Sequence, residues 1–196
     1  MKFKEYDKPS PHVVIDDFLT PEEYKDVMGE VTDLLPSMTI GKFGKDDTHL
    51  NLEHKRTINV WVDEHFINDR SQSKILKHII KIWGEEAQDF LGSTRSSTFR
   101  IYKNTTKDGT LVTVYKDGGY YKDHNDNGPG SFLSASLSMG KNFKGGEFVL
   151  EDKVIPFKDN RLIIFEANIT HRVNTVISDD NPDNWRYSIQ YFATFQ

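Results

Sequence analysis

The chain has 196 residues, of which 36% are hydrophobic and 12% aromatic, a globular composition and a length that can bury one core. Its net charge of -5 disfavours a nucleic-acid partner, and the absence of cysteine excludes a disulfide framework, a thiolate metal site and a catalytic cysteine. The N-terminus lacks the apolar segment of a signal peptide and no apolar run could span a membrane, so we expect a soluble, cytoplasmic protein with no membrane partner.

The first 95 residues predict a region rich in helix. Thr20 is placed as an N-cap, Pro21 suits the first helical position, and Glu23 completes a capping box. Apolar residues then recur at helical spacing, which predicts one buried helix face. A second long amphipathic helix is expected over residues 71–91.

Apolar residues recur with period two from about residue 96 onward, and turn sequences such as GPG and KGG separate the runs. The predicted strands, including two before that point, cover residues 11–19, 56–62, 97–103, 110–116, 131–139, 146–151, 153–157, 161–167, 171–177 and 186–195. Many short strands at regular spacing predict a sandwich or barrel. We expect one α+β, mainly β domain over residues 1–196: a double-stranded β-helix (jelly-roll) barrel over 96–196 with two supporting N-terminal helices in 1–95.

Residues 38–55 are polar and predict an irregular loop. Their length and polarity suggest that the loop lies over the barrel mouth and selects substrate.

The chain has seven histidines, and for five of them the sequence favours a structural or surface role. These five are His12, His49, His54, His65 and His78. His78 lies on the second predicted helix, beside its apolar stripe, and is expected on the helix surface. His49 and His65 each follow an aspartate by two residues, but in polar stretches where such pairs are common.

His124 and Asp126 are two residues apart, so in extended backbone their side chains point to the same side. An imidazole nitrogen beside a carboxylate oxygen suits a metal that accepts both kinds of ligand, although the pair alone is common by chance. His171 begins a later strand that a jelly roll could bring alongside. Two histidines and one carboxylate are the ligand set of non-haem Fe(II) oxygenases, and zinc hydrolases can use the same set, so the metal stays open.

Arg186 and Ser188 lie on one face of the last predicted strand. The guanidinium fork matches a carboxylate with two hydrogen bonds, and a charge that faces a barrel interior is costly unless it meets an anion. The alternative is that Arg186 pairs outside the barrel with Asp180 or Asp183.

Four motifs in order resemble the prolyl 4-hydroxylase-like branch of the Fe(II)- and 2-oxoglutarate-dependent oxygenases. In chain order they are VYKDGGYYKDHND, KNFKGGEFVLE, RLIIFEANITHRVNTV and RYSIQYF. Near the N-terminus, HVVIDDFLTPEE also resembles the opening of these proteins. Four ordered motifs over roughly half the chain are much more specific than any one of them.

The resemblance implies a role for each matching position. His124, Asp126 and His171 would be the iron ligands, and Arg186 would bind the distal carboxylate of 2-oxoglutarate. The cofactors implied are Fe(II), 2-oxoglutarate as cosubstrate and O2, with ascorbate as an auxiliary reductant that the resemblance allows.

Two further residues, Tyr115 and Ser138, match positions that line the cosubstrate pocket in relatives, and Ser188, which sits beside Arg186, is also expected to help bind the cosubstrate. For Tyr115, ordinary packing is the alternative. Two departures from the family pattern stand out. The segment between His171 and Arg186 is longer than usual, because it contains the insertion SDDNPDN, and the collagen-type branch has lysine at the position of Arg186.

The resemblance implies a dioxygenase that hydroxylates a C–H bond and releases succinate and CO2, with a prolyl residue in a peptide or protein as the favoured substrate. A free amino acid or small metabolite is the alternative. A nucleic-acid demethylase is less favoured, because such enzymes carry a second arginine where this chain has Phe192. A catalytically silent binding barrel is disfavoured by the complete set of ligand residues.

Overall fold

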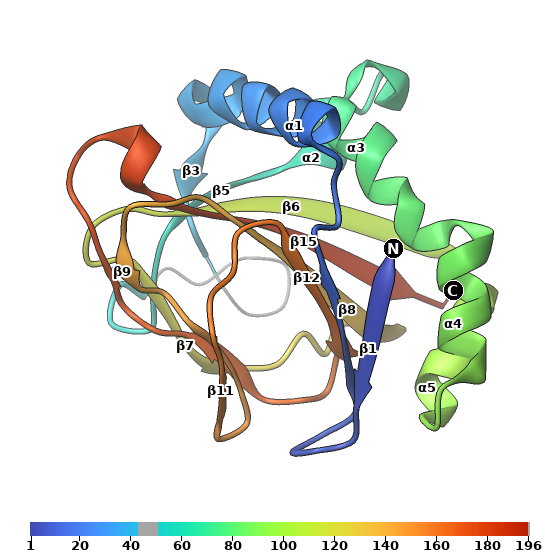
Figure 1. Cartoon of the computed structure of the whole chain (residues 1–196). Coiled ribbons are helices and arrows are strands. Elements are labelled where there is room, and N and C mark those ends of the chain that lie inside the picture. The colour runs from blue at the N-terminus through green and yellow to red at the C-terminus, as the bar shows by residue number, and fades with distance from the viewer. Residues whose placement is uncertain (43–50, 196) are drawn as a thin grey trace.

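Two antiparallel sheets face each other in the computed structural model of the chain, which describes residues 1–42 and 51–195 (Figure 1). The larger sheet has eight strands in the order β1 (Lys2–Tyr6), β2 (His12–Asp16), β12 (Arg161–Glu166), β8 (Ser131–Met139), β15 (Arg186–Thr194), β6 (Lys107–Tyr115), β5 (Ile58–Trp61) and β3 (Thr39–Ile40). The smaller sheet has five strands in the order β11 (Lys153–Ile155), β10 (Phe148–Leu150), β13 (His171–Val173), β7 (Tyr120–His124) and β4 (Lys55–Arg56). A separate pair joins β9 (Lys144–Gly145) to β14 (Val176–Ile177).

The prediction of a mainly β, antiparallel domain is confirmed, and the facing sheets are consistent with a jelly roll. A closed barrel is not confirmed, because no strand pairing joins the two large sheets among the described residues. The first 95 residues also contribute β1 to β5, so this part of the chain is more than a helical support.

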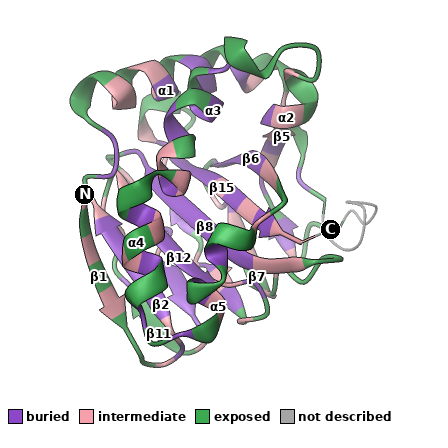
Figure 2. Ribbon diagram, turned by 90° about the vertical axis from the view of Figure 1, so that its right-hand side faces the viewer, coloured by how far each residue is buried: buried purple, intermediate pink, exposed green. Residues whose placement is uncertain are grey.

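The larger sheet separates two cores, one on each face. Strand β8 shows why, because apolar residues and serines alternate along it and successive side chains of a strand point to opposite faces. Its apolar residues enter the core beneath the helices, namely Leu133, Ala135, Leu137 and Met139. Figure 2 shows the buried residues running along β8, β15 and β6 under the helices. A second, smaller core lies between the two sheets, around Phe148, Phe165 and Tyr115.

Helix α1 (Pro21–Leu34) begins as the sequence predicts. The Thr20 hydroxyl accepts a hydrogen bond from the Glu23 backbone N–H at 3.3 Å, and the Glu23 carboxylate accepts one from the Thr20 N–H at 2.8 Å. The capping box therefore satisfies two backbone donors that the first turn would leave unpaired.

The second predicted helix, over residues 71–91, is wrong as a single element. It consists of α3 (Lys74–Ile79), a 3-10 turn η4 (Ile80–Trp83) and α4 (Glu85–Ser93). Gly84 breaks it, since its backbone is extended (φ -62°, ψ 156°) and serves as the N-cap of α4. Apolar periodicity continues across the break because α3, η4 and α4 face the same core, so the pattern alone does not reveal the interruption.

The strand predicted over residues 97–103 is also wrong. The segment forms α5 (Ser97–Arg100) and a 3-10 turn η5 (Tyr102–Asn104). The Ser96 hydroxyl caps α5 by accepting the Phe99 N–H at 3.3 Å. Phe99 and Tyr102 are buried at helical spacing, while Ile101, which a strand would have buried with Phe99, is 40% exposed.

Smaller differences concern the ends and interruptions of elements. The strands predicted over 56–62 and 171–177 are each two strands, and Val62 already begins the short helix α2 (Val62–His65). Of the loop predicted over 38–55, residues 43–50 lie outside the described part, and β3 and the first residue of β4 lie in the rest. The remaining 3-10 turns are η1 (Leu35–Ser37), η3 (Arg70–Gln72) and η6 (Pro182–Asn184). No helix that the structure describes combines the length and apolarity needed to cross a membrane.

His78 is buried between α1 and α3, not placed on the helix surface as the sequence suggests. Its Nε2 lies 3.3 Å from a carboxylate oxygen of Asp26, and its Nδ1 lies 3.8 Å from one of Glu23. The sequence around His78 does not reveal this contact, because both carboxylates belong to α1, which is distant in sequence.

Glu30 joins α1 to α3 through a buried carboxylate. It accepts hydrogen bonds from the Ser73 hydroxyl at 2.6 Å, from the Ile75 N–H at 3.2 Å and from the Lys74 N–H. These donors belong to the first turn of α3, so Glu30 supplies a cap from another helix.

We expect Glu30→Ala to lower the free energy of unfolding by about 2 kcal/mol, because it leaves buried backbone donors without an acceptor. Urea denaturation measures the change. Asp33→Ala, at an exposed position of the same helix, should change it by less than about 0.5 kcal/mol. Equal effects of the two substitutions would contradict the capping role of Glu30.

Candidate metal centre

His124 and His171 are brought face to face by strand pairing in the smaller sheet. His124 ends β7 and His171 begins β13, and the two residues are direct partners in the antiparallel register. Their ring centroids are 4.1 Å apart. The pairing therefore joins two positions that are distant in sequence.

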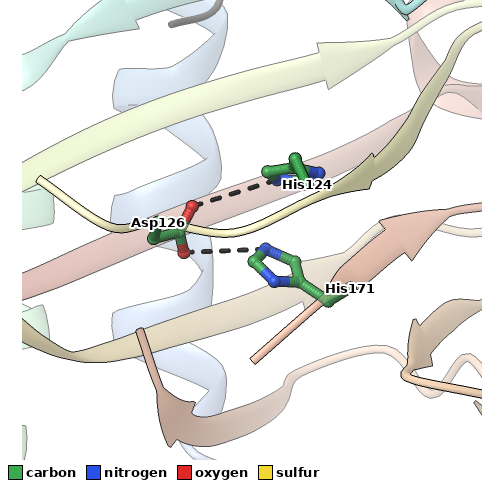
Figure 3. A group of neighbouring side chains, drawn as sticks. All are labelled: His124, Asp126 and His171. Atoms are coloured by element: carbon green, nitrogen blue, oxygen red, sulfur yellow. Dashed lines mark ion pairs between the residues drawn. The ribbon is translucent and has the colours of Figure 1, made fainter. Parts of the chain in front are cut away.

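Asp126 turns its carboxylate toward both histidines (Figure 3). One carboxylate oxygen is 3.9 Å from Nε2 of His124, and the other is 3.6 Å from Nε2 of His171. Its backbone N–H donates to the Ala167 carbonyl at 2.8 Å, which ties the loop after β7 to the segment after β12 (Arg161–Glu166). One ligand atom from each residue lies within 4.8 Å of the others, so the structure brings together the three residues that the sequence singled out.

The two histidines present the nitrogen that a metal requires. Nδ1 of His124 lies 2.8 Å from the Lys122 carbonyl, and Nδ1 of His171 lies 2.9 Å from the Ile169 carbonyl. A carbonyl only accepts hydrogen bonds, so each Nδ1 carries a proton, and Nε2 is the nitrogen of each ring that faces Asp126 and can bind a metal. Burial, and then the neighbouring His171, lowers the pKa of His124 well below its usual value, so this imidazole is neutral at neutral pH.

Aromatic side chains pack against both imidazole rings. Tyr121 stacks on His124 with the ring centroids 3.4 Å apart. Phe165 meets His171 edge-on at 4.7 Å, and Phe148 stacks on it at 5.4 Å. Two imidazole nitrogens and one carboxylate fit a divalent metal such as Fe(II), and they leave the remaining coordination positions for other ligands.

None of the other described histidines joins this group. His12 is buried and hydrogen-bonded through Nδ1 to the Ser10 carbonyl at 2.8 Å, which is a structural role. His54 is partly buried, and His65 is exposed. His49 lies outside the described residues.

Arg186 is fully buried at the start of β15. Its Nε donates to the Gly146 carbonyl at 2.8 Å, and one Nη donates to the Ser138 hydroxyl at 3.3 Å. The other terminal nitrogen, Nη1, has no hydrogen-bond partner among the described residues. The guanidinium carbon lies 4.8 Å from the centroid of the Tyr115 ring, so the cation also packs on an aromatic face.

The alternative pairing of Arg186 with Asp180 or Asp183 does not occur, because Arg186 forms no ion pair within residues 1–42 and 51–195. Burial lowers the pKa of its guanidinium from the usual value. Burying a cation that has an unused hydrogen-bond donor costs free energy, unless an anion binds to that donor and compensates the charge. The site is therefore suited to a carboxylate.

The two serines have different surroundings. Ser138 contacts Arg186 directly, so it can share a carboxylate ligand with it. Among the described residues Ser188 forms no hydrogen bond with Arg186: its hydroxyl lies 3.0 Å from that of Ser136 and accepts a hydrogen bond from Gln190 at 2.9 Å.

Gln190 and Thr113 belong to the same polar network and were not singled out from the sequence. The Thr113 hydroxyl donates to the Gln190 amide oxygen at 3.0 Å. Gln190 lies two residues beyond Ser188, and the period-two rule that links Arg186 to Ser188 would have found it. Thr113 carries no local signal, because only the pairing of β6 with β15 places it there.

A large cavity of about 1740 Å³, here called the inner cavity, lies on the side of the larger sheet that faces the smaller one. Its lining includes the metal-ligand group, together with Tyr115, Gln190, Trp61 and Phe192. Tyr115 lines this space and packs against Arg186, and burial raises the pKa of the Tyr115 phenol to about 12, so the hydroxyl keeps its proton. The cavity extends from the triad to the end of the sheet where β6 begins and β15 ends.

Comparison with known proteins identifies what this arrangement resembles. A family model described as the 2OG-Fe(II) oxygenase superfamily matches residues 110–194, the part of the chain that carries the triad and Arg186. No curated protein sequence matches the chain.

The solved structures that resemble the chain include prolyl hydroxylases. A prolyl hydroxylase from Trichoplax adhaerens, in complex with a hypoxia inducible factor oxygen degradation domain peptide fragment, is 20% identical with a TM-score of 0.67, covering 93% of this chain and 83% of that one. A prolyl-4-hydroxylase from Pseudomonas putida is 14% identical with a TM-score of 0.59, covering 94% and 92%. A viral collagen prolyl hydroxylase from Paramecium Bursaria Chlorella virus-1, in its 2OG complex, is 16% identical with a TM-score of 0.55, covering 93% and 94%. These likenesses establish a shared fold, and the resemblance to this group that the motifs predict is confirmed.

Proposed function

From the match of residues 110–194 to the 2OG-Fe(II) oxygenase superfamily, we propose that this chain is an Fe(II)- and 2-oxoglutarate-dependent dioxygenase that hydroxylates a prolyl residue in a peptide or protein. The iron, cosubstrate and O2 together supply the oxidation, with release of succinate and CO2. His124, Asp126 and His171 hold the iron, and Arg186 with Ser138 binds the distal carboxylate of 2-oxoglutarate.

Arg186 is the observation that carries this proposal. Its buried Nη1 lacks a hydrogen-bond partner in the part of the chain that the structure describes, and the hydroxyl of Ser138 lies beside the same guanidinium. Neither a zinc hydrolase nor a silent binding barrel requires an anion next to Arg186, so neither function explains a buried cation without a counter-ion. A dicarboxylate cosubstrate, with one end at the metal and the other at Arg186, satisfies both features.

The remaining residues position the reactants and exclude water. Phe148 and Phe165 form an apolar wall beside His171, so that side of the metal is dry. Tyr115 keeps its proton and packs on Arg186, which leaves a neutral hydroxyl donor in the inner cavity.

The size of the inner cavity favours a polypeptide over a free amino acid. Its volume of about 1740 Å³ exceeds the roughly 300–1000 Å³ of a typical small-molecule site. The peptide bound to the Trichoplax adhaerens enzyme supports the same choice by analogy. A free amino acid or small metabolite is the alternative, and the absence of a second arginine at Phe192 argues against a nucleic-acid substrate.

Mass spectrometry tests the proposal directly. We expect incubation with Fe(II), 2-oxoglutarate and ascorbate to convert a proline-containing peptide into a product heavier by one oxygen atom, with matching release of succinate. Free proline and reactions without 2-oxoglutarate are the controls. Oxygenation of free proline alone would favour the small-molecule alternative, and turnover that needs zinc but not 2-oxoglutarate would contradict the proposed class.

A further inference from the structure

A second cavity of about 770 Å³ lies on the helix side of the larger sheet, and we call it the outer cavity. It is bounded by η3, α3, η4 and the start of β6. The side chains that matter here are Arg70, Leu76, Lys77, Ile80, Trp83 and Lys107. None of the roles proposed for the metal centre uses this space.

The outer and inner cavities meet at one edge. Lys107 and Asp108 line both of them. These residues begin β6, and successive side chains of a strand point to opposite faces of the sheet. An extended chain that leaves the metal centre along the inner cavity can therefore pass over this rim into the outer cavity.

The floor of the outer cavity is apolar. Leu76 and Ile79 are buried beneath it, and Trp83 lines it from η4. Ile80 is 59% exposed at its edge and extends the apolar surface of the floor toward solvent. The surface is thus suited to an apolar side chain from another segment.

The rim of the outer cavity is positively charged, although the chain as a whole carries a net charge of -5. Lys77 and Lys107 are exposed, and neither forms an ion pair with any described residue. Arg70 is already paired, with Asp63 at 2.8 Å and Asp108 at 3.4 Å. The two free cations beside an apolar floor complement a segment that carries both acidic and apolar side chains.

We propose that the outer cavity docks a segment of the polypeptide substrate that flanks the hydroxylated residue and is rich in acidic and apolar side chains. The occupant is the substrate itself, because the two cavities share a rim. This assignment rests on the proposed function for the nature of the substrate. The metal centre selects the residue that reacts, and the outer cavity selects the polypeptide that carries it.

Two peptides test the proposal. They share a proline-containing core that the oxygenation screen identifies, and they differ only in the flank, which is rich in leucine and glutamate in one and in serine and lysine in the other. We expect the acidic, apolar flank to bind the full-length, metal-free protein about tenfold more tightly, as measured by fluorescence anisotropy. Raising the ionic strength should reduce this preference.

Four variants locate the interaction. Lys77→Glu and Ile80→Ser should each remove most of the preference. Lys103→Glu and Ile101→Ser are matched controls, because both positions are exposed but line neither cavity, and they should keep it. In turnover, Lys77→Glu should raise the KM for the acidic peptide several-fold while kcat and the KM for 2-oxoglutarate stay unchanged.

Equal binding of the two peptides, or an unchanged preference in both Lys77→Glu and Ile80→Ser, would overturn the docking proposal. Failure of the proposed function has a different signature. If the screen finds no oxygenated product, the same two flanks are joined to an alanine-rich core. A flank preference that depends on Lys77 would then support the docking surface, while the missing product contradicts the hydroxylase assignment.

Discussion

Asp126→Ala is expected to abolish metal binding and succinate formation together. The substitution removes the single carboxylate of the triad and leaves only the two imidazoles. Because loss of a residue that merely orients a ligand already costs about 10- to 100-fold in affinity or activity, loss of the ligand itself should cost at least about 100-fold. Anaerobic titration with Fe(II), or with Co(II) as an air-stable probe, measures the affinity, and succinate release measures the reaction.

Asp123→Ala is the matched control for this experiment. Asp123 lies on β7, three residues before Asp126, is exposed and pairs at the surface with Arg172 at 3.1 Å, so its removal should leave metal binding intact. His171→Ala should behave like Asp126→Ala. Normal turnover of 2-oxoglutarate by a folded His171→Ala protein would refute the assignment of the metal site.

Arg186→Ala should mainly weaken 2-oxoglutarate and leave the metal in place. Removing one partner of a buried, hydrogen-bonded charge pair costs about 2–5 kcal/mol, which corresponds to a KM for 2-oxoglutarate higher by about 30- to 5000-fold. Arg186→Lys keeps the charge but loses the two-pronged donor, so its KM should lie between those of the wild type and the alanine variant. Steady-state kinetics at saturating peptide measure the change.

Because Arg186 is fully buried, its loss also disturbs packing, and folding must be measured separately. Arg186→Met keeps most of the side-chain volume and should fold with a KM like that of Arg186→Ala. Arg95→Ala, at a side chain that is 81% exposed, is the control. An unchanged KM for 2-oxoglutarate in a folded Arg186→Met protein would contradict the role of this residue.

The strands that flank the metal centre could be predicted because their sequences alternate and their ends carry turn residues. The strand predicted over 131–139 matches β8 in full, and that over 186–195 matches β15 to within one residue. Alternation failed at 97–103, where Phe99 fits both a strand and a helix and the burial of Tyr102 decides for the helix. The local sequence pattern does not show whether Tyr102 is buried, because its burial depends on which distant residues pack against the segment.

For the candidate site, too, local sequence predicts some features, and others depend on the tertiary structure. His124 and Asp126 form a local motif, but only the register of β7 against β13 brings His171 to them. The burial of Arg186 follows from its place in the strand, whereas the free Nη1 is visible only in three dimensions. Ser188 was placed beside Arg186 because the two share a face, and a strand face is too coarse to predict which neighbours exchange hydrogen bonds.

His124 and His171 each fix their ring through a carbonyl two residues earlier in the chain, at Lys122 and Ile169. The entropy cost of orienting both imidazole rings is therefore incurred during folding. Binding of a metal then requires little rearrangement of these two ligands. A site prepared in this way discriminates weakly among divalent ions of similar size, for which affinity follows the general order from Mn(II) up to Cu(II). Occupancy by iron then depends on which metals the surroundings supply, and competition from tighter-binding ions becomes a means of inhibition that requires no dedicated regulatory site.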